Sequence, residues 1–245
     1  MEVLYNRPST LVDEGTHGYC PGCMHGTSVK VVSEVLDEMG LKDDVVLIFG
    51  VGCAGNARPW ITYDSMGGPH GRACAAATGY KRTNPKEFVL TYQGDGDLAA
   101  IGLAETVHAA NRGENFSVIF INNGTYGMTG GQMAPTTLIG QKASTAPFGR
   151  RPEEHGYPIH VCELLATLKA PAYLERVTMI DAPHILKAKA AVQKAFQNQL
   201  DGKGFSLVEV ISNCPTNWGL TPVECIDYMK ENSLVEYPLG VFRDR

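Results

Sequence analysis

The sequence predicts an α/β protein: a mostly parallel sheet with helices on both faces. Two observations lead to this class. Short apolar runs of strand length recur along the chain, and stretches of helical length with apolar residues on one face separate them. The chain has 245 residues, enough for a sizeable core, and shows no internal repeat, low-complexity segment or linker. We therefore expect one domain over residues 1–245.

The elements are expected in a regular order. Apolar runs predict strands at Val45–Gly50, Phe88–Gly94, Phe116–Asn122, Ala172–Ile180 and Phe205–Ile211. Helical spacing predicts helices at Thr27–Met39, His70–Asn84 (ended by Pro85), Leu98–Asn111, Pro183–Leu200 and Thr221–Lys230. In the third helix, Leu98, Ile101, Ala104, Glu105 and His108 follow helical spacing, and His108 is expected to be a packing or surface residue. Residues 123–157 have no clear periodicity, which is typical of an active-site loop.

Charge and cysteine content narrow the function classes. The net charge is −5, the pI is about 5.8, and no Lys/Arg cluster exceeds two residues. This argues against nucleic-acid or membrane-surface partners. The longest apolar run is too short to span a bilayer, and residues 1–15 lack a signal-peptide pattern, so we expect a cytoplasmic protein. Seven scattered cysteines indicate reduced thiols or metal ligands.

An acid and two amides stand at the ends of neighbouring predicted strands. Asp95, in "GDGD", follows one strand, and Asn123, in "INN", follows the next. A right-handed crossover brings the carboxyl ends of the two strands together. Gly94 and Gly96 allow a ligand close to the backbone, and a helix beginning near Asp97 favours phosphate. Since Asp95 alone would repel phosphate, the pattern indicates Mg²⁺ bridging protein and diphosphate. The plainer alternative is that both motifs are turns.

The cysteines of "CPGC", Cys20 and Cys23, have the spacing of metal ligands. A thioredoxin-like redox pair is disfavoured because no apolar strand precedes them. Zinc and an iron–sulfur cluster both remain open, and each needs two more ligands. Cys53 and Cys214 follow predicted strands, so we expect them at the same edge of the sheet as Asp95. The helix after Cys23 is expected to help keep the thiols deprotonated.

The GDG motif followed about thirty residues later by NN resembles thiamine diphosphate enzymes. The fuller pattern "CPGC…GVGC…HGRACAAATG…GDGD…INN…YGMTGGQ…NCPTN" covers nearly the whole chain. It resembles the β subunit of 2-oxoacid:ferredoxin oxidoreductases, which has a thiamine-diphosphate-binding fold. The resemblance implies that Asp95, Asn123 and the Thr125 carbonyl bind Mg²⁺. It also implies a [4Fe–4S] cluster on Cys20, Cys23, Cys53 and Cys214.

The resemblance also implies the remaining pocket residues. They would be Gly52, His70, Gly94, Gly96, Asp97, Gly127, Met128 and Thr129, with His70 a candidate catalytic residue. Arg72 would either touch the ligands or be a surface arginine. Cys74, Cys162 and Cys225 match no motif and are expected to be small core residues in helices.

The function implied is coenzyme-A-dependent oxidative decarboxylation of a 2-oxo acid such as 2-oxoglutarate or 2-oxoisovalerate, with electrons passed to ferredoxin. No sequence feature marks the glutamate that thiamine catalysis needs. The resemblance places that glutamate on an α subunit with the pyrimidine-binding domain, and leaves any further clusters to other small or ferredoxin-like subunits. Two alternatives are a non-oxidative thiamine decarboxylase or lyase and a zinc-pinned, non-catalytic binding protein.

Overall fold

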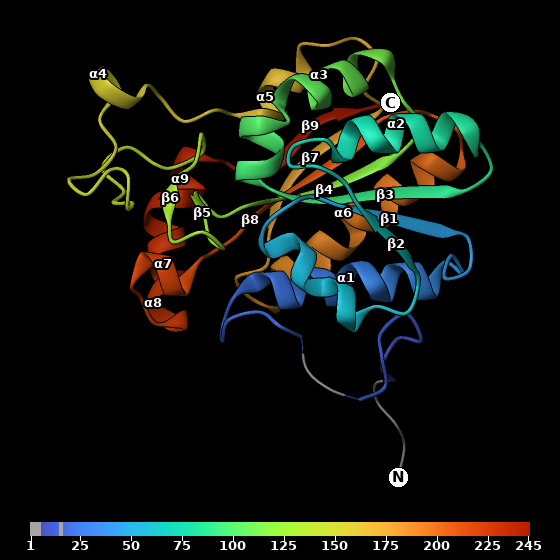
Figure 1. Cartoon of the computed structure of the whole chain (residues 1–245), viewed down its shortest axis with the longest axis horizontal. Coiled ribbons are helices and arrows are strands. Elements are labelled where there is room, and N and C mark those ends of the chain that lie inside the picture. The colour runs from blue at the N-terminus through green and yellow to red at the C-terminus, as the bar shows by residue number, and fades with distance from the viewer. Residues whose placement is uncertain (1–5, 15–16) are drawn as a thin grey trace.

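A seven-stranded sheet is the centre of this computed structural model, which describes residues 6–14 and 17–245 (Figure 1). The strand order is β2-β1-β3-β4-β8-β7-β9, and every neighbouring pair is parallel except β7 with β9. The strands are β1 Val45–Phe49, β2 Asp64–Gly67, β3 Phe88–Gly94, β4 Ser117–Asn122, β7 Tyr173–Thr178, β8 Ser206–Ile211 and β9 Gly240–Asp244. The predicted mostly parallel α/β sheet is confirmed.

Helices cover both faces of this sheet, as Figure 1 shows. One face packs against α1 and α6, and the other against α2, α3 and α5. The helices are α1 Met24–Glu38, α2 Ala73–Thr83, α3 Leu103–Arg112, α4 Pro152–His155, α5 Val161–Ala166, α6 Ala182–Leu200, α7 Pro215–Trp218, α8 Pro222–Tyr228 and α9 Leu234–Glu236. The chain also forms a 3₁₀ helix, η1 Cys53–Trp60, and two π-helical turns, η2 Gly96–Ile101 and η3 Met229–Ser233.

Alternation along the strands explains why both faces are covered. In β1, Val45, Leu47 and Phe49 pack toward α1 and α6, while Val46 and Ile48 pack toward α2. All five are buried. Because successive side chains point to opposite faces, a strand that is apolar throughout needs a helical layer on each side.

The predicted helix Leu98–Asn111 is interrupted. A π-helical turn, η2, ends at Ile101, and α3 begins at Leu103. Gly102 separates them, and a Cβ there would lie 2.4 Å from the carbonyl oxygen of Gly71. The interruption breaks the single face predicted from spacing, since Leu98 is buried whereas Ile101 and His108 are exposed. His108 was expected to be either a packing or a surface residue, and the structure places it on the surface.

Several elements differ from the expected order. The first helix begins at Met24, directly after Cys23, and not at Thr27. Strands β2 and β9 and helix α5 were not predicted. The two strands lie at the edges of the sheet and are partly exposed, so neither carries the apolar run that marked the buried strands.

The segment after β4 is mostly irregular, as expected. It contains the hairpin β5 Thr125–Tyr126 with β6 Gln132–Met133 and the short α4, which projects from the body in Figure 1. Buried Arg150 ties this segment together, because its guanidinium donates to the carbonyls of Pro135, Thr137 and Tyr157, among others.

In the described ranges, none of the helices combines the length and the apolar character needed to cross a bilayer. The signal-peptide expectation concerns residues 1–15, of which residues 1–5 and 15 lie outside the described ranges. The single-domain organisation stays a prediction.

Candidate cofactor and cluster site

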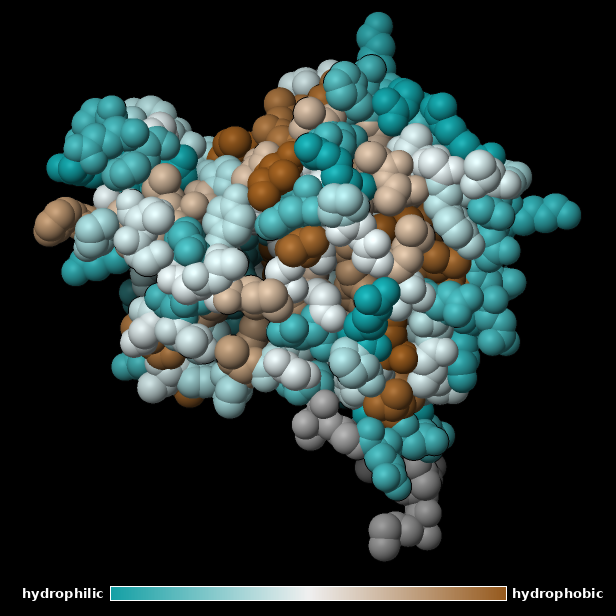
Figure 2. Space-filling model, viewed as in Figure 1, coloured by the Kyte–Doolittle hydropathy of each residue, from teal (hydrophilic) through white to brown (hydrophobic). Residues whose placement is uncertain are grey.

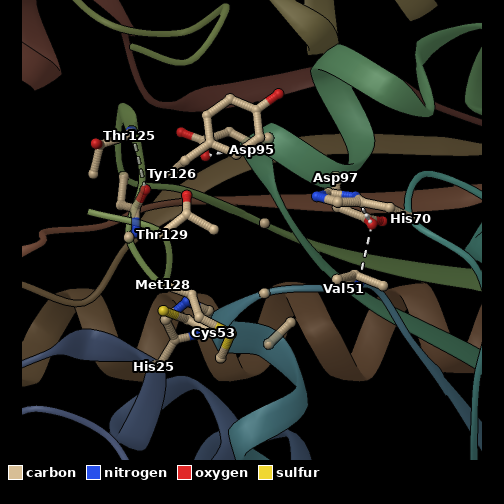
Figure 3. A pocket seen from close by; sticks show the side chains of 16 residues that line it. His25, Val51, Cys53, His70, Asp95, Asp97, Thr125, Tyr126, Met128 and Thr129 are labelled. Carbon is tan, nitrogen blue, oxygen red and sulfur yellow. Dashed lines mark hydrogen bonds and ion pairs between the residues drawn. The ribbon is translucent and has the colours of Figure 1, made fainter. Parts of the chain in front are cut away.

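A pocket opens at the carboxyl edge of the sheet, where the loops after β1, β3 and β4 meet (Figure 3). Every residue predicted to bind cofactor lines it: Gly52, His70, Gly94, Asp95, Gly96, Asp97, Asn123, Thr125, Gly127, Met128 and Thr129. These residues come from four separate stretches of sequence. Their assembly follows from the parallel strand order β1-β3-β4, which aligns the strand ends along one edge.

Asp95 is a buried carboxylate at this edge, with only 2 % of the residue exposed. One of its oxygens accepts from the Thr136 hydroxyl at 2.7 Å and the other from the Gly96 N–H at 2.8 Å. Among the described residues no lysine, arginine or histidine pairs with it. Burial raises the pKa of the Asp95 carboxyl to about 6. A buried acid held only by neutral donors is suited to a cation.

Asn123 and Thr125 lie next to Asp95 on the pocket wall. Both are mostly buried. The Asn123 side-chain oxygen accepts from the Thr125 N–H at 3.2 Å, which folds the chain tightly after β4. The donor set at this corner is therefore all oxygen: a carboxylate, an amide and backbone carbonyls. Mg²⁺ favours such ligands.

Asp97 is held differently, although it is only two residues away. Its Oδ1 accepts from the backbone of Val51 (2.9 Å) and Gly71 (2.8 Å) and lies 2.7 Å from His70 Nδ1. Its Oδ2 accepts from the Gln93 amide at 2.7 Å. The carboxylate thus fixes two pocket loops and, by accepting from His70, favours the tautomer with the proton on Nδ1. Figure 3 draws the contact between Asp97 and Val51 as a dashed line. Direct contact between Asp97 and a cofactor stays a prediction.

Tyr126 packs across the backbone of the GDG motif. A Cβ at Gly96 would lie 2.3 Å from the Tyr126 ring, so the position accepts only glycine without a rearrangement. The Tyr126 ring also meets His70 edge-on, with centroids 6.4 Å apart. Both contacts narrow the pocket above Asp95.

The four motif cysteines line a second cavity beside the first. Cys20, Cys23, Cys53 and Cys214 all border it. The two cavities share part of their lining, namely His25, Cys53, Asn123 and Gly127. Cys20 and Cys214 are nearly 200 residues apart in sequence, yet they line one cavity. That cavity shares lining residues with the cofactor pocket.

Asn213 fastens the CPGC turn to the strand end that carries Cys214. Its side chain accepts from the Met24 N–H at 3.0 Å and donates to the Gly22 carbonyl at 3.1 Å. Gly22 has a φ of +74°, and a Cβ there would collide with Pro222 at 2.3 Å. These contacts explain why the turn needs a glycine and why it sits against Cys214.

The helix after Cys23 acts on the thiol in the expected direction, but burial acts more strongly. Burial, reinforced by neighbouring cysteines, raises the pKa of Cys23 to about 12 and that of Cys53 to about 11. The backbone N–H of His25, at the start of α1, does lower the pKa of Cys23, but burial outweighs it. The helix alone therefore does not keep the thiols deprotonated.

The donor set fits an iron–sulfur group. The four thiols border a common cavity, and thiolates are the ligands of such clusters. Within residues 6–14 and 17–245, no three His, Cys, Asp or Glu side chains lie close enough together to hold a metal ion. The remaining cysteines, Cys74, Cys162 and Cys225, are fully buried in α2, α5 and α8, which confirms their core role.

Sequence reasoning missed several residues of the site. His25 is 1 % exposed and lies between the two cavities, with Nδ1 2.9 Å from the Tyr92 hydroxyl. Burial lowers its pKa to about 4, so its ring is neutral. Its place in "CPGCMHG" was the available signal. Asn217 lies in "NCPTN", one of the quoted motifs, but nothing in the motif pointed to this side chain itself. Thr136 gave no signal, because its contact with Asp95 spans 41 residues. Arg72 is exposed and pairs with Glu105 at 2.7 Å, which confirms the surface alternative.

The fold and the arrangement of GDG and NN around one pocket define a thiamine-diphosphate-binding domain. The family described as "Thiamine pyrophosphate enzyme, C-terminal TPP binding domain" matches residues 50–210, and the chain belongs to this family.

Relatives narrow the family further. The chain is 48% identical over 245 residues to the ketoisovalerate oxidoreductase subunit VorA of Methanothermobacter marburgensis, an alignment covering 100% of this chain and 51% of that protein. It is 36% identical over 228 residues to the 2-oxoglutarate synthase subunit KorB of Methanocaldococcus jannaschii, covering 91% and 80%. The chain thus belongs with the 2-oxoacid:ferredoxin oxidoreductase subunits, while spanning about half the length of the ketoisovalerate relative.

A solved structure supports the fold. The 2-oxoglutarate:ferredoxin oxidoreductase from Magnetococcus marinus, solved with 2-oxoglutarate, coenzyme A and succinyl-CoA bound, superposes with a TM-score of 0.81. The two chains are 23% identical, and the match covers 99% of this chain and 86% of that one.

Proposed function

We propose that this chain is the thiamine-diphosphate- and cluster-binding subunit of a coenzyme-A-dependent 2-oxoacid:ferredoxin oxidoreductase. One observation carries the proposal: the four motif cysteines surround a cavity that shares its wall with the GDG and NN pocket. A non-oxidative lyase has no use for thiols there, and a zinc-pinned binding protein leaves the pocket unexplained. Thiamine diphosphate, when bound, would supply the carbanion chemistry that removes CO2 from a 2-oxo acid.

Mg²⁺ would be held by Asp95, Asn123 and the Thr125 carbonyl. The buried, cation-free environment of Asp95 supports this ligand set. Backbone N–H groups of the glycine-rich stretch Gly127–Thr129 would face the diphosphate from the opposite wall.

A [4Fe–4S] cluster would be held by Cys20, Cys23, Cys53 and Cys214. The shared lining of these four cysteines around one cavity beside the cofactor pocket supports this ligand set. The shared wall would keep the cluster within easy electron-transfer distance of the cofactor.

His70 is the residue of this chain best suited to handle a proton in the pocket. Its Nδ1 is committed to Asp97, so Nε2 carries the free lone pair. The Asp97 carboxylate also holds the ring in one orientation, as carboxylates do for histidine bases in other enzymes. We assign His70 as a catalytic residue and Asp97 as its positioning residue.

The chain would work with an α subunit. Among the described residues that line the pocket there is no glutamate, so the acid for the aminopyrimidine would come from a partner's pyrimidine-binding domain. Exposed apolar residues at the rim, Val51 at 43 % and Met128 at 52 %, suit a covering chain. Figure 2 shows brown hydrophobic groups scattered among hydrophilic ones on the face of the molecule that Figure 1 presents. Ferredoxin, coenzyme A and any additional cluster-bearing subunits complete the assembly.

A branched-chain 2-oxo acid such as 2-oxoisovalerate is the preferred substrate. No lysine or arginine lies among the described residues lining the pocket, whereas Val51 and Met128 do. This chain therefore offers no cation for the distal carboxylate of 2-oxoglutarate, which stays the alternative substrate.

The test uses the complex of this chain with its α partner. The parent should convert 2-oxoisovalerate and coenzyme A to CO2 and acyl-CoA while reducing ferredoxin. Cys214→Ser should keep single-turnover CO2 release and lose ferredoxin reduction, because one cluster ligand is gone. Cys225→Ser, a buried cysteine outside the cavity, is the matched control and should keep both. Undiminished ferredoxin reduction in Cys214→Ser would refute the electron route.

A further inference from the structure

Asn217, on the short helix α7, connects the two cavities through one side chain. Its Nδ2 lies 2.9 Å from the Gly127 carbonyl oxygen and 3.3 Å from Cys214 Sγ. Its amide orientation is fixed chemically, since a carbonyl oxygen can only accept and a thiolate can only accept. The two N–H bonds of one amide group therefore point at two different sites.

The Gly127 carbonyl belongs to the loop that lines the cofactor pocket. That loop is pressed onto the sulfurs: a Cβ at Gly127 would lie 3.2 Å from Cys53 Sγ and 3.6 Å from Cys214 Sγ. A Cβ at neighbouring Gly131 would lie 3.0 Å from the Asn217 side chain. The glycines thus let the loop approach Asn217 closely enough to bond with it.

The Cys214 sulfur is the other partner. Asn217 Nδ2 donates to this sulfur at 3.3 Å, and Asn217 lies only three residues further along the chain. An N–H donor that stabilises negative charge on a ligand sulfur stabilises the reduced form of a cluster more than the oxidised form. Loss of the donor therefore makes the cluster harder to reduce.

We propose that Asn217 is a positioning residue that raises the reduction potential of the cluster and fastens the cofactor loop to it. This inference rests on the proposed function, because it requires a cluster at the four cysteines. It predicts a paired effect on two measurable quantities, the midpoint potential and the affinity for thiamine diphosphate. A residue that only supports the fold would change neither selectively.

The experiment compares Asn217→Leu, which keeps the volume but has no donor, with Asn232→Leu. Asn232 is exposed, lies in η3 outside the lining of both cavities and donates to the Tyr228 carbonyl at 3.0 Å, so the same substitution there is the matched control. Both variants are purified anaerobically in complex with the α partner. Iron content, the midpoint potential from EPR-monitored titration, and thiamine diphosphate affinity from tryptophan fluorescence are measured without substrate.

Asn217→Leu should retain iron, shift the potential to more negative values and bind thiamine diphosphate several-fold more weakly. Asn232→Leu should match the parent in all three. Asn217→Ser, which restores one shorter donor, should fall between parent and Asn217→Leu in potential. An unchanged potential in Asn217→Leu, or loss of iron from both Asn217 variants, would overturn the inference. A parent protein without a cluster would instead refute the proposed function.

Discussion

The β7–β8 side of the sheet and the cofactor edge both bury charged side chains, and they differ in how those charges are paired. At the β7–β8 side of the sheet, Arg176 is fully buried and donates to Glu209 at 2.8 Å and to Glu163 at 2.9 Å. Its guanidinium also lies 4.7 Å from the Phe242 ring centroid. At the cofactor edge, Asp95 is equally buried and meets only neutral donors. A buried charge that is paired within the chain is structural, whereas a buried charge left unpaired marks a place for a ligand.

Removing the paired charge should have the largest effect on stability. Arg176→Met would leave the Glu209 carboxylate buried without its cation, so we expect the free energy of unfolding to fall by about 3–5 kcal/mol. Denaturant unfolding measures it. The double variant Arg176→Met/Glu209→Gln removes the stranded charge and keeps an acceptor for the Asn122 amide, which is 2.8 Å from Glu209. The double variant should recover at least half of the lost free energy of unfolding. A double variant as unstable as Arg176→Met would contradict the pairing argument.

Removing the unpaired charge of Asp95 should leave the fold intact and greatly weaken the binding of thiamine diphosphate with Mg²⁺. Asp95→Asn keeps the size of the side chain, so Mg²⁺-dependent thiamine diphosphate binding should weaken by more than about 100-fold. The free energy of unfolding should stay the same or rise slightly, because a desolvated carboxylate is gone. Titration calorimetry with and without Mg²⁺ measures the affinity. Parent-like affinity would show that Asp95 is not a ligand.

Removing the Thr136 hydroxyl, which donates to Asp95, should weaken thiamine diphosphate binding less than Asp95→Asn does. Thr136→Val removes the 2.7 Å hydrogen bond to Asp95 and nearly preserves the shape of the side chain. Partners behind a metal ligand typically affect affinity by about 10–100-fold, so we expect a loss near the lower end. The same calorimetric titration checks it. An effect as large as that of Asp95→Asn would mean that the variant has disturbed the pocket itself.

The two ion pairs that Glu114 makes with exposed arginines should give the smallest effect on stability. Burial would raise the pKa of Glu114, but hydrogen bonds from Arg82 (2.6 Å) and Arg112 (2.6 Å) lower it overall. A lowered carboxyl pKa contributes stability above its unfolded value near 4.3, and that contribution is lost as the pH falls through the folded value. Glu114→Gln should cost up to about 1 kcal/mol at pH 7.

The stability difference between parent and Glu114→Gln should shrink as the pH drops below about 4.3. Thermal unfolding at several pH values and two salt concentrations measures it. A difference that persists unchanged at low pH would mean that lost packing, and not charge, causes it.

The sequence predicted what depends on strand order. Asp95, Asn123, Cys53 and Cys214 could be placed at one edge because each directly follows an apolar run, and the structure puts all four there. Edge strands β2 and β9 escaped prediction because exposed strands need no apolar run.

Contacts made across long stretches of chain could not be predicted. Thr136 reaches Asp95 from 41 residues away, and Asn213 reaches the CPGC turn from 189 residues away. A single threonine or asparagine in a loop carries no periodicity, so only the folded chain shows what it holds. The sequence also did not reveal that the helix is interrupted at Gly102, where Gly71 approaches closely from another part of the chain.

The most direct test of the account is the metal content of anaerobically purified protein, assayed for iron, acid-labile sulfide and zinc on the same sample as its visible spectrum. The account predicts a brown protein with about four irons and four sulfides per chain, whose broad absorption bleaches on reduction. Stoichiometric zinc without iron, in a colourless protein, would contradict it.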